Sequence, residues 1–431
     1  MSTSIDQLTQ ILQTLLIDDA DRIGRESGFI QRQRKLSGAS FAQTVIFGWQ
    51  ANPQASLEEL CQSAWNSGVS ISPQGLQARL NSGQANQFLY RLLLQSLDYL
   101  VEGEAAGSTL LHRFTSVYLQ DSSKIRLPKS LRHQWSGNSQ TGQEAVLKIQ
   151  TVFEYQRGGL GLVLAPGRHH DCPLQKTDLE AGSLRLADVG YFKVKVFEKL
   201  NERGVYWLSR LPARAGVWQN DHVVHVLGWL KQQKTDCIDQ TVELTAQRLP
   251  CRLIAVRVPA EVAKERRKRV REAAKARKKT QLKSETLDLC DWTIIVTNLE
   301  VGMLSVEEAL RLLRLRWQIE LLFKLWKQHL SLDEWRSQNA CQILSEVYAK
   351  LLVALIQHWF CILGCWQETT RSLVKACLML QKHARHIHAV FGDFTALRHT
   401  LETILPTLAR CKVQKRKARP ATFQLLGFTP P

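Results

Sequence analysis

The order of strand-like and helix-like segments between residues 108 and 215 limits the fold of this chain more than any other feature. Three short runs rich in β-branched and aromatic residues come first and are separated by turn residues. Two further strand candidates follow, with the helix-like stretch FKVKVFEKLNERG between them. Three strands followed by alternating strand and helix predict a mixed sheet with helices on its faces, and therefore an α/β fold. The five predicted strands lie in 114–123, 144–156, 159–167, 183–192 and 205–215.

Helical patterns flank this region, because apolar residues recur at helical spacing near both ends of the chain. The runs HVVHVLGWL, CIDQTVELT and CRLIAVRVP are strand-like, with no helical pattern between them, and predict an all-β insertion. We therefore predict four parts: a helical N-terminal domain, a sheet-containing core in two pieces, a β-rich insertion with a basic segment, and a helical C-terminal domain. They cover, in that order, residues 1–107, 108–215 with 290–345, 216–289, and 346–431.

Residues 56–80, SLEELCQSAWNSGVSISPQGLQARL, have the outline of a helix-turn-helix. Ser56 and Glu59 form a capping box that predicts the start of one helix, and Ser72 predicts the start of a second after a turn. In a helix-turn-helix unit the second helix would lie in a DNA major groove. We therefore predict that residues 1–107 form a DNA-binding domain. The same pattern fits an ordinary helical hairpin, so both interpretations of residues 56–80 stay open.

The chain is strongly basic, since 57 Lys and Arg against 39 Asp and Glu give a net charge of +18 and a pI near 9.6. Such an excess favours a polyanionic partner, most commonly nucleic acid, over a basic enzyme without one. The segment 263–283, AKERRKRVREAAKARKKTQLK, carries only two acids, Glu265 and Glu272. This composition favours a phosphate-facing role, although a solvated helix also fits.

No segment predicts secretion or a membrane span. The first residues, MSTSIDQLTQ, lack the basic flank and apolar core of a signal peptide. The most hydrophobic run, YAKLLVALIQHWFCILGCW, is interrupted by Lys350, Gln357 and His358, which favours a buried helix. Ten cysteines without a CxxC pair fit a reduced compartment. We expect a soluble cytoplasmic protein with no membrane partner.

Two aspartates stand where a predicted strand gives way to a polar loop. Asp121 ends VYLQD, and Asp188 ends LRLAD. Ligands of α/β proteins gather at such strand ends, although an aspartate there is also a common turn former. Converging carboxylates repel one another, and hard divalent cations relieve that repulsion. Two ions about 3.5–4 Å apart can assist phosphodiester displacement, which a basic, nucleic-acid-binding surface would serve.

A third carboxylate, Glu320, lies in RLRWQIELLFKLWKQ, which predicts one helix over residues 314–328. Arg316, Glu320 and Lys327 stand at offsets of zero, four and eleven, so they share a face, with Lys324 on the same side. Glu320 would complete the carboxylate site, and the cations would hold phosphates beside it. A solvated salt-bridge face is the alternative. The other large side chains are expected to pack elsewhere: Trp317, Leu321 and Phe323.

These motifs resemble those of DDE transposases, in particular the bacterial insertion-sequence group with a Tyr-Arg-Glu-Lys signature. Arg316, Glu320 and Lys327 match that signature at the expected spacing, and Leu313 stands at its tyrosine position. QDSSKIRLP and ADVGYF are similar to the family's first and second acid motifs. The resemblance extends from near the N-terminus to RKARPATFQLL and includes a β insertion between the second and third motifs.

The resemblance implies an RNase H-like core in which Asp121, Asp188 and Glu320 hold two Mg²⁺ ions, with Mn²⁺ as a substitute. It implies cut-and-paste transposition, in which hydrolytic nicking at the element ends precedes attack of a 3′-hydroxyl on DNA; related enzymes form a hairpin intermediate. The partners would be the terminal inverted repeats and target DNA, bound by a homodimer in a synaptic complex at the nucleoid.

Arg210, at the end of a predicted core strand, and Trp292 are further candidates for DNA contact. Trp292 could receive a flipped base, while a structural arginine and a core tryptophan are the alternatives. Two other functions fit the same residues: a metal-dependent nuclease that does not join strands, and a non-catalytic DNA-binding repressor derived from a transposase. Leucine at position 313 is expected to be compatible with activity.

Overall fold

The computed structural model describes residues 2–32, 36–106, 108–138, 143–169, 179–276 and 284–413. The chain divides into two compact units. Unit 1 comprises Met1–Ser108, Ser122–His170 and Gln318–Pro431, and unit 2 comprises Thr109–Asp121 and Asp171–Trp317. The assignment of a DNA-binding, a catalytic and a C-terminal role to separate parts of the chain stays a prediction. The basic tail after residue 413 lies outside the described residues.

Unit 1 is built from the helices at both ends of the chain, as predicted. Serine side chains cap most of its N-terminal helices, and Ser56 and Glu59 form the expected capping box. The N-terminal helices are α1 (Ile5–Gln13), the π-helix Thr14–Asp19, α2 (Ala20–Glu26), α3 (Gly38–Ala51), α4 (Leu57–Trp65), α5 (Pro73–Leu80) and α6 (Gly83–Ser96). The later ones are α12 (Trp317–His329), α13 (Ala340–Cys365), α14 (Leu373–Ala389), α15 (Phe394–Ile404) and the 3₁₀-helix Leu405–Arg410.

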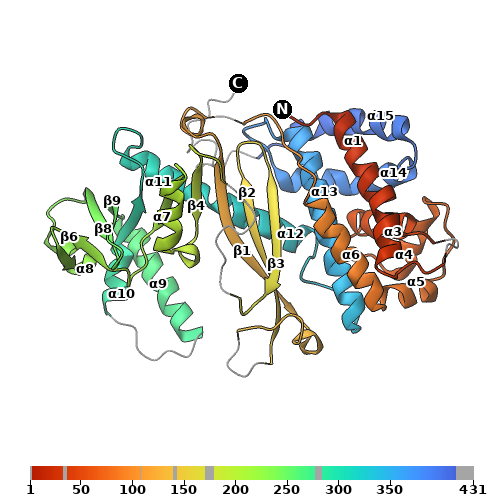
Figure 1. The fold of residues 1–431 in the computed structure, drawn as a ribbon, viewed down its shortest axis with the longest axis horizontal. Helices are drawn as coiled ribbons and strands as arrows, with labels where there is room; N and C mark the ends of the chain where they lie inside the picture. The colour runs from red at the N-terminus through yellow and green to blue at the C-terminus, as the bar shows by residue number, and fades with distance from the viewer. Residues whose placement is uncertain are drawn as a thin grey trace. The chain divides into compact units, whose positions relative to one another are not determined.

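Helix α13 forms the centre of the helical part of unit 1. It packs against α3, α6 and α14, and it runs alongside α6 in Figure 1. Among the described residues it is the one helix long and apolar enough to cross a membrane, and 94% of its most apolar window is buried inside the protein. The buried position agrees with the prediction of a core helix. Gln357 and His358, which interrupt the apolar run, are buried with it.

The strands of unit 1 are β2 (Ala145–Glu154) and β3 (Leu160–Pro166), an antiparallel pair in which Thr151 faces Leu162. Strand β1 (Val117–Leu127) is the neighbour of β2 in the strand order. Its first residues, up to Asp121, belong to unit 2. Short 3₁₀ turns, Leu111–Arg113 and Lys129–Leu131, precede and follow β1.

Unit 2 contains a mixed sheet with the strand order β1-β4-β5-β10-β9-β8-β6-β7. The pairs β1–β4 and β4–β5 are parallel, and the remaining neighbours are antiparallel. This confirms the predicted α/β fold with a mixed sheet. The strands are β4 (Leu184–Ala187), β5 (Tyr206–Arg210), β6 (Val217–Gln219), β7 (His222–Val224), β8 (Cys237–Leu244), β9 (Leu249–Arg257) and β10 (Trp292–Thr297).

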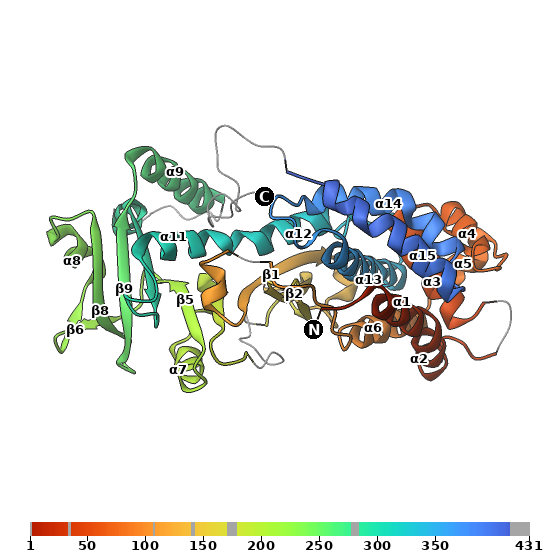
Figure 2. The same cartoon turned by 90° about the horizontal axis from the view of Figure 1, so that it is seen from above.

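Helices cover both sides of this sheet. Figure 2 shows α7 (Val194–Glu202) and α9 (Ala260–Ala276) on opposite sides of the strands of unit 2. The apolar side of α7 packs on the sheet, and Phe197 stacks on Trp207 with ring centroids 4.0 Å apart. The remaining helices of unit 2 are the 3₁₀-helix Val189–Tyr191, α8 (Val226–Gln232), α10 (Ser284–Asp288), the 3₁₀-helix Leu289–Asp291 and α11 (Val306–Leu315).

Two predicted elements differ from the structure. The insertion is not entirely β, because the run HVVHVLGWL ends in helix α8. The His225 side chain accepts a hydrogen bond from the Gly228 backbone, and Leu227 and Leu230 are buried three residues apart, so a helix buries this run. The single helix predicted for 314–328 is divided into α11 and α12, with Arg316 between them.

Candidate active site

Asp121 and Asp188 lie next to each other because β1 and β4 are parallel and paired in register. Gln120 is paired with Ala187, and each aspartate is the next residue along its strand. Asp188 follows the last residue of β4, as predicted. The prediction that a strand ends at Asp121 is wrong, since β1 continues to Leu127. Asp121 instead marks the end of the part of β1 that pairs with β4.

The guanidinium group of Arg316 lies between these two carboxylates. Its Nη1 is 3.1 Å from Oδ2 of Asp121, and its Nη2 is 3.8 Å from Oδ1 of Asp188. The Asp121 side chain is 17% exposed and that of Asp188 is 47% exposed, so solvent reaches the second carboxylate. One guanidinium shared by two carboxylates offsets their mutual repulsion and holds them close together.

Gln120 on β1 and Arg185 on β4 form a buried polar pair close to the two aspartates along the strands. Arg185 on β4 donates from Nε and Nη2 to Oε1 of Gln120 at 2.9 and 2.5 Å. Burial lowers the pKa of Arg185 to about 10. Side chains alternate along a strand, so Gln120 and Asp121 face opposite sides of β1. The sequence analysis missed this pair, although an arginine inside the apolar strand SLRLAD is an unusual residue for a buried strand.

The other residues of the predicted helical face lie on α12. Lys327 donates from Nζ to the backbone oxygen of Lys124 on β1 at 2.8 Å, and it lies 3.9 Å from the Asp333 carboxylate. Glu320 is half-buried in the first turn of α12, and Lys324 is exposed. Lys327, Glu320 and Lys124 belong to unit 1, whereas Asp121, Asp188 and Arg316 belong to unit 2.

No group of three or more His, Cys, Asp or Glu side chains able to hold a metal ion occurs within the described residues. Asp121, Asp188 and Arg316 are brought together, while the joining of Glu320 to them stays a prediction.

Two large apolar side chains beside the signature do not pack as expected. Trp317 is 57% exposed and Leu321 is 52% exposed, whereas Phe323 is buried. Leu313, at the tyrosine position of the signature, is buried on α11.

Arg210 and Trp292 line one cavity of about 670 Å³ in unit 2. Arg210 is exposed at the end of β5. Trp292 is buried at the start of β10, and the guanidinium of Arg257 lies 4.5 Å from its ring centroid. Its packing is that of a core tryptophan with a cation over one face. A role of either residue in contacting DNA stays a prediction.

A mixed sheet carrying one aspartate directly after the paired part of each of two parallel strands defines the class: an α/β protein with a carboxylate site on its sheet. The family described as Transposase DDE domain matches residues 112–356, which include all three predicted acids. The chain belongs to this family of transposases and is therefore an enzyme of that kind. This confirms the predicted family, while membership of the Tyr-Arg-Glu-Lys group stays a prediction.

Curated relatives agree with the family. The transposase for insertion sequence element IS231D of Bacillus thuringiensis subsp. finitimus is 27% identical over 362 residues, which cover 78% of this chain and 75% of the relative. The transposase for insertion sequence element IS1151 of Clostridium perfringens is 23% identical over 373 residues, covering 80% and 78%. A shorter similarity, 36% over 107 residues, links 25% of this chain to 29% of the putative transposase InsL for IS186A of Escherichia coli.

Proposed function

We propose that this chain catalyses cut-and-paste transposition of an insertion sequence, with Asp121, Asp188 and Glu320 as the catalytic carboxylates. The observation that carries the proposal is the pair of aspartates on parallel strands, bridged by Arg316. Arg316 stands four residues before Glu320 and has helical backbone angles, which supports a shared role of the two side chains. Lys327, seven residues after Glu320, bonds to β1 three residues beyond Asp121.

The donor set suits hard divalent cations, because carboxylate oxygens are the ligands that Mg²⁺ prefers. Asp121 and Asp188 already share one positive group, the Arg316 guanidinium, which supports their capacity to hold positive charge between them. We propose two Mg²⁺ ions, replaceable by Mn²⁺, held by Asp121, Asp188 and Glu320. When bound, such ions activate an attacking oxygen and stabilise the leaving one.

The cations of the signature would hold DNA phosphates beside the carboxylates. The Arg316 guanidinium offers donors in a planar fork that matches a phosphate. Lys327 uses one bond for the Lys124 carbonyl, and an ammonium group has three donors. Lys324, exposed one turn after Glu320, would add a further charge. Arg210, exposed at the end of β5, would contact DNA from the cavity that it lines together with the buried Trp292.

The proposed partners are the terminal inverted repeats of the element and its target DNA, bound by a homodimer at the nucleoid. The names of the relatives, transposases for insertion sequence elements, support this substrate. The helical pair α4 and α5, whose caps match the predicted helix-turn-helix, is a candidate reader of the terminal repeat.

Substitution of Asp188 by Asn tests the catalytic assignment, because it removes the carboxylate charge at nearly constant volume. The variant should bind a duplex made from the DNA flanking the reading frame but should not cut it in Mg²⁺. Asp221→Asn is the matched control, since Asp221 is an exposed aspartate of the same unit and lies outside the proposed site. Cutting by the Asp188 variant at the wild-type rate would remove Asp188 from the mechanism.

Strand transfer separates this function from its nearest alternative. A transposase should join pre-cleaved element ends to target DNA, whereas a metal-dependent nuclease should cut without joining. Binding without cutting in both Mg²⁺ and Mn²⁺ would instead identify a DNA-binding repressor.

A further inference from the structure

Helix α9 is fixed to the sheet of unit 2 by two of its arginines. Arg266 donates to the backbone oxygen of Trp292 and to Oγ1 of Thr293, each at 2.9 Å. Arg267 donates to the Leu287 carbonyl and forms an ion pair with Asp291. Burial lowers the pKa of Arg266, as expected for a cation inside the fold. These two cations are therefore used to hold the helix.

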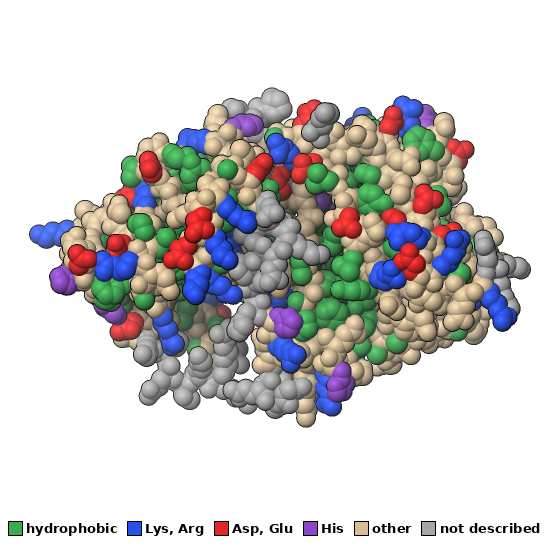
Figure 3. Space-filling view, in the orientation of Figure 1, with side chains coloured by type: hydrophobic (Ala, Val, Ile, Leu, Met, Phe, Trp, Pro, Cys, Tyr) green, Lys and Arg blue, Asp and Glu red, His purple; other side chains and the backbone are tan. Residues whose placement is uncertain are grey.

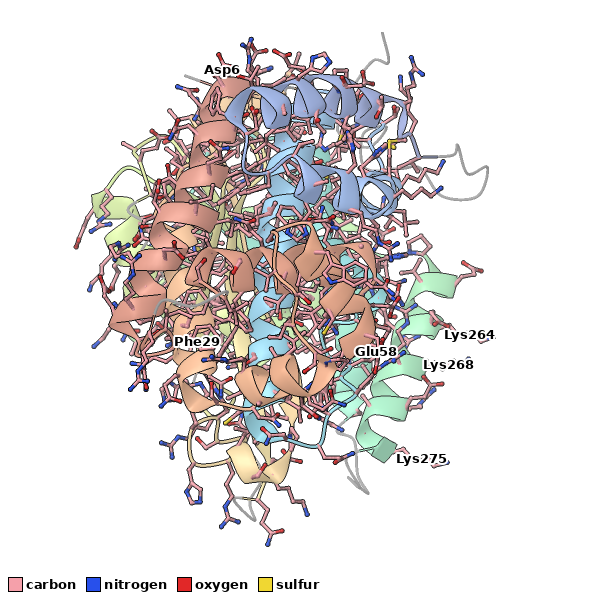
Figure 4. All side chains as sticks on the ribbon, turned by 90° about the vertical axis from the view of Figure 1, so that its right-hand side faces the viewer. Asp6, Phe29, Glu58, Lys264, Lys268 and Lys275 are labelled. Atoms are coloured by element: carbon pink, nitrogen blue, oxygen red, sulfur yellow. The ribbon has the colours of Figure 1, made fainter. Side chains whose placement is uncertain are left out.

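Four other cations of α9 form a stripe on a different face: Lys264, Lys268, Arg271 and Lys275. Their offsets of zero, four, seven and eleven place them on one side of a helix, and at 1.5 Å per residue the stripe is about 16 Å long. All four are exposed, and none forms an ion pair with another described residue. Figure 4 labels Lys264, Lys268 and Lys275 and shows them pointing away from the ribbon.

The acids of α9 are fewer than its cations, and none forms an ion pair with the stripe within the described part of the chain. Glu261, Glu265 and Glu272 stand three or four residues from members of the stripe, and Glu265 pairs with Arg269 at 3.1 Å. Like charges three and four residues apart repel and destabilise a helix. On the face of the molecule that Figure 3 shows, Lys and Arg side chains are spread among Asp and Glu side chains. A helix needed only for the fold would gain from acids within the stripe.

We propose that the stripe Lys264, Lys268, Arg271 and Lys275 binds the phosphate backbone of DNA without reading its sequence. The proposal rests on the proposed function, which supplies DNA as the partner. Duplex DNA carries one negative charge per about 1.7 Å of its axis, so a stripe of this length always faces several phosphates, whatever the base sequence.

The stripe and the catalytic aspartate Asp188 are parts of one unit. The segment that anchors α9 begins β10, and the strand order β4-β5-β10 connects that strand to the one that ends before Asp188. DNA bound along α9 would therefore be held at a fixed place relative to Asp188. This surface would add affinity for any DNA segment, and the base-specific part of recognition would come from other elements.

The salt dependence of binding tests the stripe. The variant Lys268→Gln/Arg271→Gln removes two of its charges, and Lys195→Gln/Lys199→Gln is the matched control. Lys195 and Lys199 are exposed lysines on α7 of the same unit, and the control changes the net charge equally. Each lost phosphate contact lowers the slope of log K against log salt by about 0.9, so the stripe variant should lose about two units of slope.

A mixed-sequence duplex is the probe, with circular dichroism to confirm that both variants fold. At 0.1 M salt we expect the stripe variant to bind about 10- to 60-fold more weakly than wild type, and the control to keep the wild-type slope. Equal slopes for wild type and the stripe variant would overturn the inference and leave the proposed function standing. Equal losses in both variants would also overturn it, because general charge would then explain them.

Two further outcomes test whether DNA is the partner of the stripe. A wild-type chain that binds no duplex at low salt would overturn the proposed function together with this inference. Anionic phosphatidylserine vesicles form the second arm. Loss of vesicle binding in the stripe variant, with unchanged DNA binding, would assign the stripe to a lipid surface and overturn the DNA proposal.

Discussion

Lys350 on α13 makes three contacts inside unit 1, two of which hold the loop that follows α12. Its Nζ lies 2.7 Å from Oε1 of Glu346 and donates to the backbone oxygens of Ser331 and Glu334, each at 2.9 Å. The Lys350 side chain is 1% exposed and that of Glu346 is 7% exposed. Ser331 has a φ of +45°, which L-residues other than glycine rarely adopt. The loop thus contains backbone strain that other contacts must offset.

Substitution of Lys350 by Met keeps the length of the side chain and removes its charge. Burial lowers the pKa of Lys350 and raises that of Glu346, so each charged form depends on the other. The variant leaves the Glu346 carboxylate buried without a cation, and two carbonyls lose their donor. Breaking a buried pair on one side costs about 3–5 kcal/mol, and we expect a loss of unfolding free energy in that range.

The double variant Lys350→Met/Glu346→Leu separates the two effects. Replacing both charges by apolar groups should recover most of the stability, to within about 1–2 kcal/mol of wild type. The Ser331 and Glu334 carbonyls still lack their donor, so the loop after α12 should stay loosened. Asp333 of this loop lies 3.9 Å from the Lys327 ammonium, so we expect both variants to cut DNA more slowly than wild type. The double variant would then be nearly as stable as wild type but less active. A purely structural role of the ion pair would not produce this difference.

Urea denaturation followed by far-ultraviolet circular dichroism measures the stabilities. Arg398→Met is the matched control, because Arg398 pairs with Asp6 at 2.6 Å and both side chains are exposed; Asp6 is labelled in Figure 4. An exposed pair contributes about 0–1 kcal/mol, so the control should lose little. A loss below about 1 kcal/mol for Lys350→Met, or a double variant as unstable as the single one, would refute the reasoning.

Three further predictions concern acid, the bridging arginine and metal. Burial lowers the pKa of His358 and His388 to about 4, so the unfolded chain takes up protons first below pH 6.5. The unfolding free energy from urea titrations should therefore fall between pH 6.5 and 4, by up to about 3 kcal/mol per histidine. The fall should be smaller in His388→Asn, and an equal fall in wild type and this variant would contradict the prediction. Arg316→Lys should cut more than about tenfold more slowly in single-turnover assays, since lysine cannot bridge Asp121 and Asp188 bidentately; wild-type cutting would contradict the bridge. EDTA should abolish cutting but not binding, and Mg²⁺ or Mn²⁺ should restore it; cutting in EDTA would exclude a metal requirement.

Secondary structure was predicted correctly from the sequence where a local pattern allowed a single interpretation. Strands β2 and β3 and the helix after Asp188 appear near their expected bounds, because alternation and turn residues mark them. Strands β4 and β5 begin near their predicted starts but end at Ala187 and Arg210, before the predicted ends at 192 and 215. The caps at Ser56 and Ser72 were read from the sequence for the same reason, since a capping serine contacts only residues close in sequence.

The predictions from sequence failed where the structure depends on a feature that no local pattern reveals. HVVHVLGWL is an apolar run too short for its period to separate strand from helix, and a histidine cap decided for helix α8. The end of β1 was misplaced because polar residues after Asp121 resemble a loop, whereas the strand continues to Leu127. Arg185 has its partner, Gln120, at a distance of 65 residues in the sequence, which no periodicity reveals.

The Gln120–Arg185 pair explains why two separate acid motifs can make one site. Side chains alternate along a strand, so a slip of one residue between β1 and β4 would move one aspartate to the other face. A buried arginine left without its acceptor is costly, and a slipped register would separate its guanidinium from the amide of Gln120. The correct register is thus favoured by a contact on the face opposite the carboxylates. The position of Asp121 beside Asp188 therefore depends on two residues that are not catalytic residues themselves.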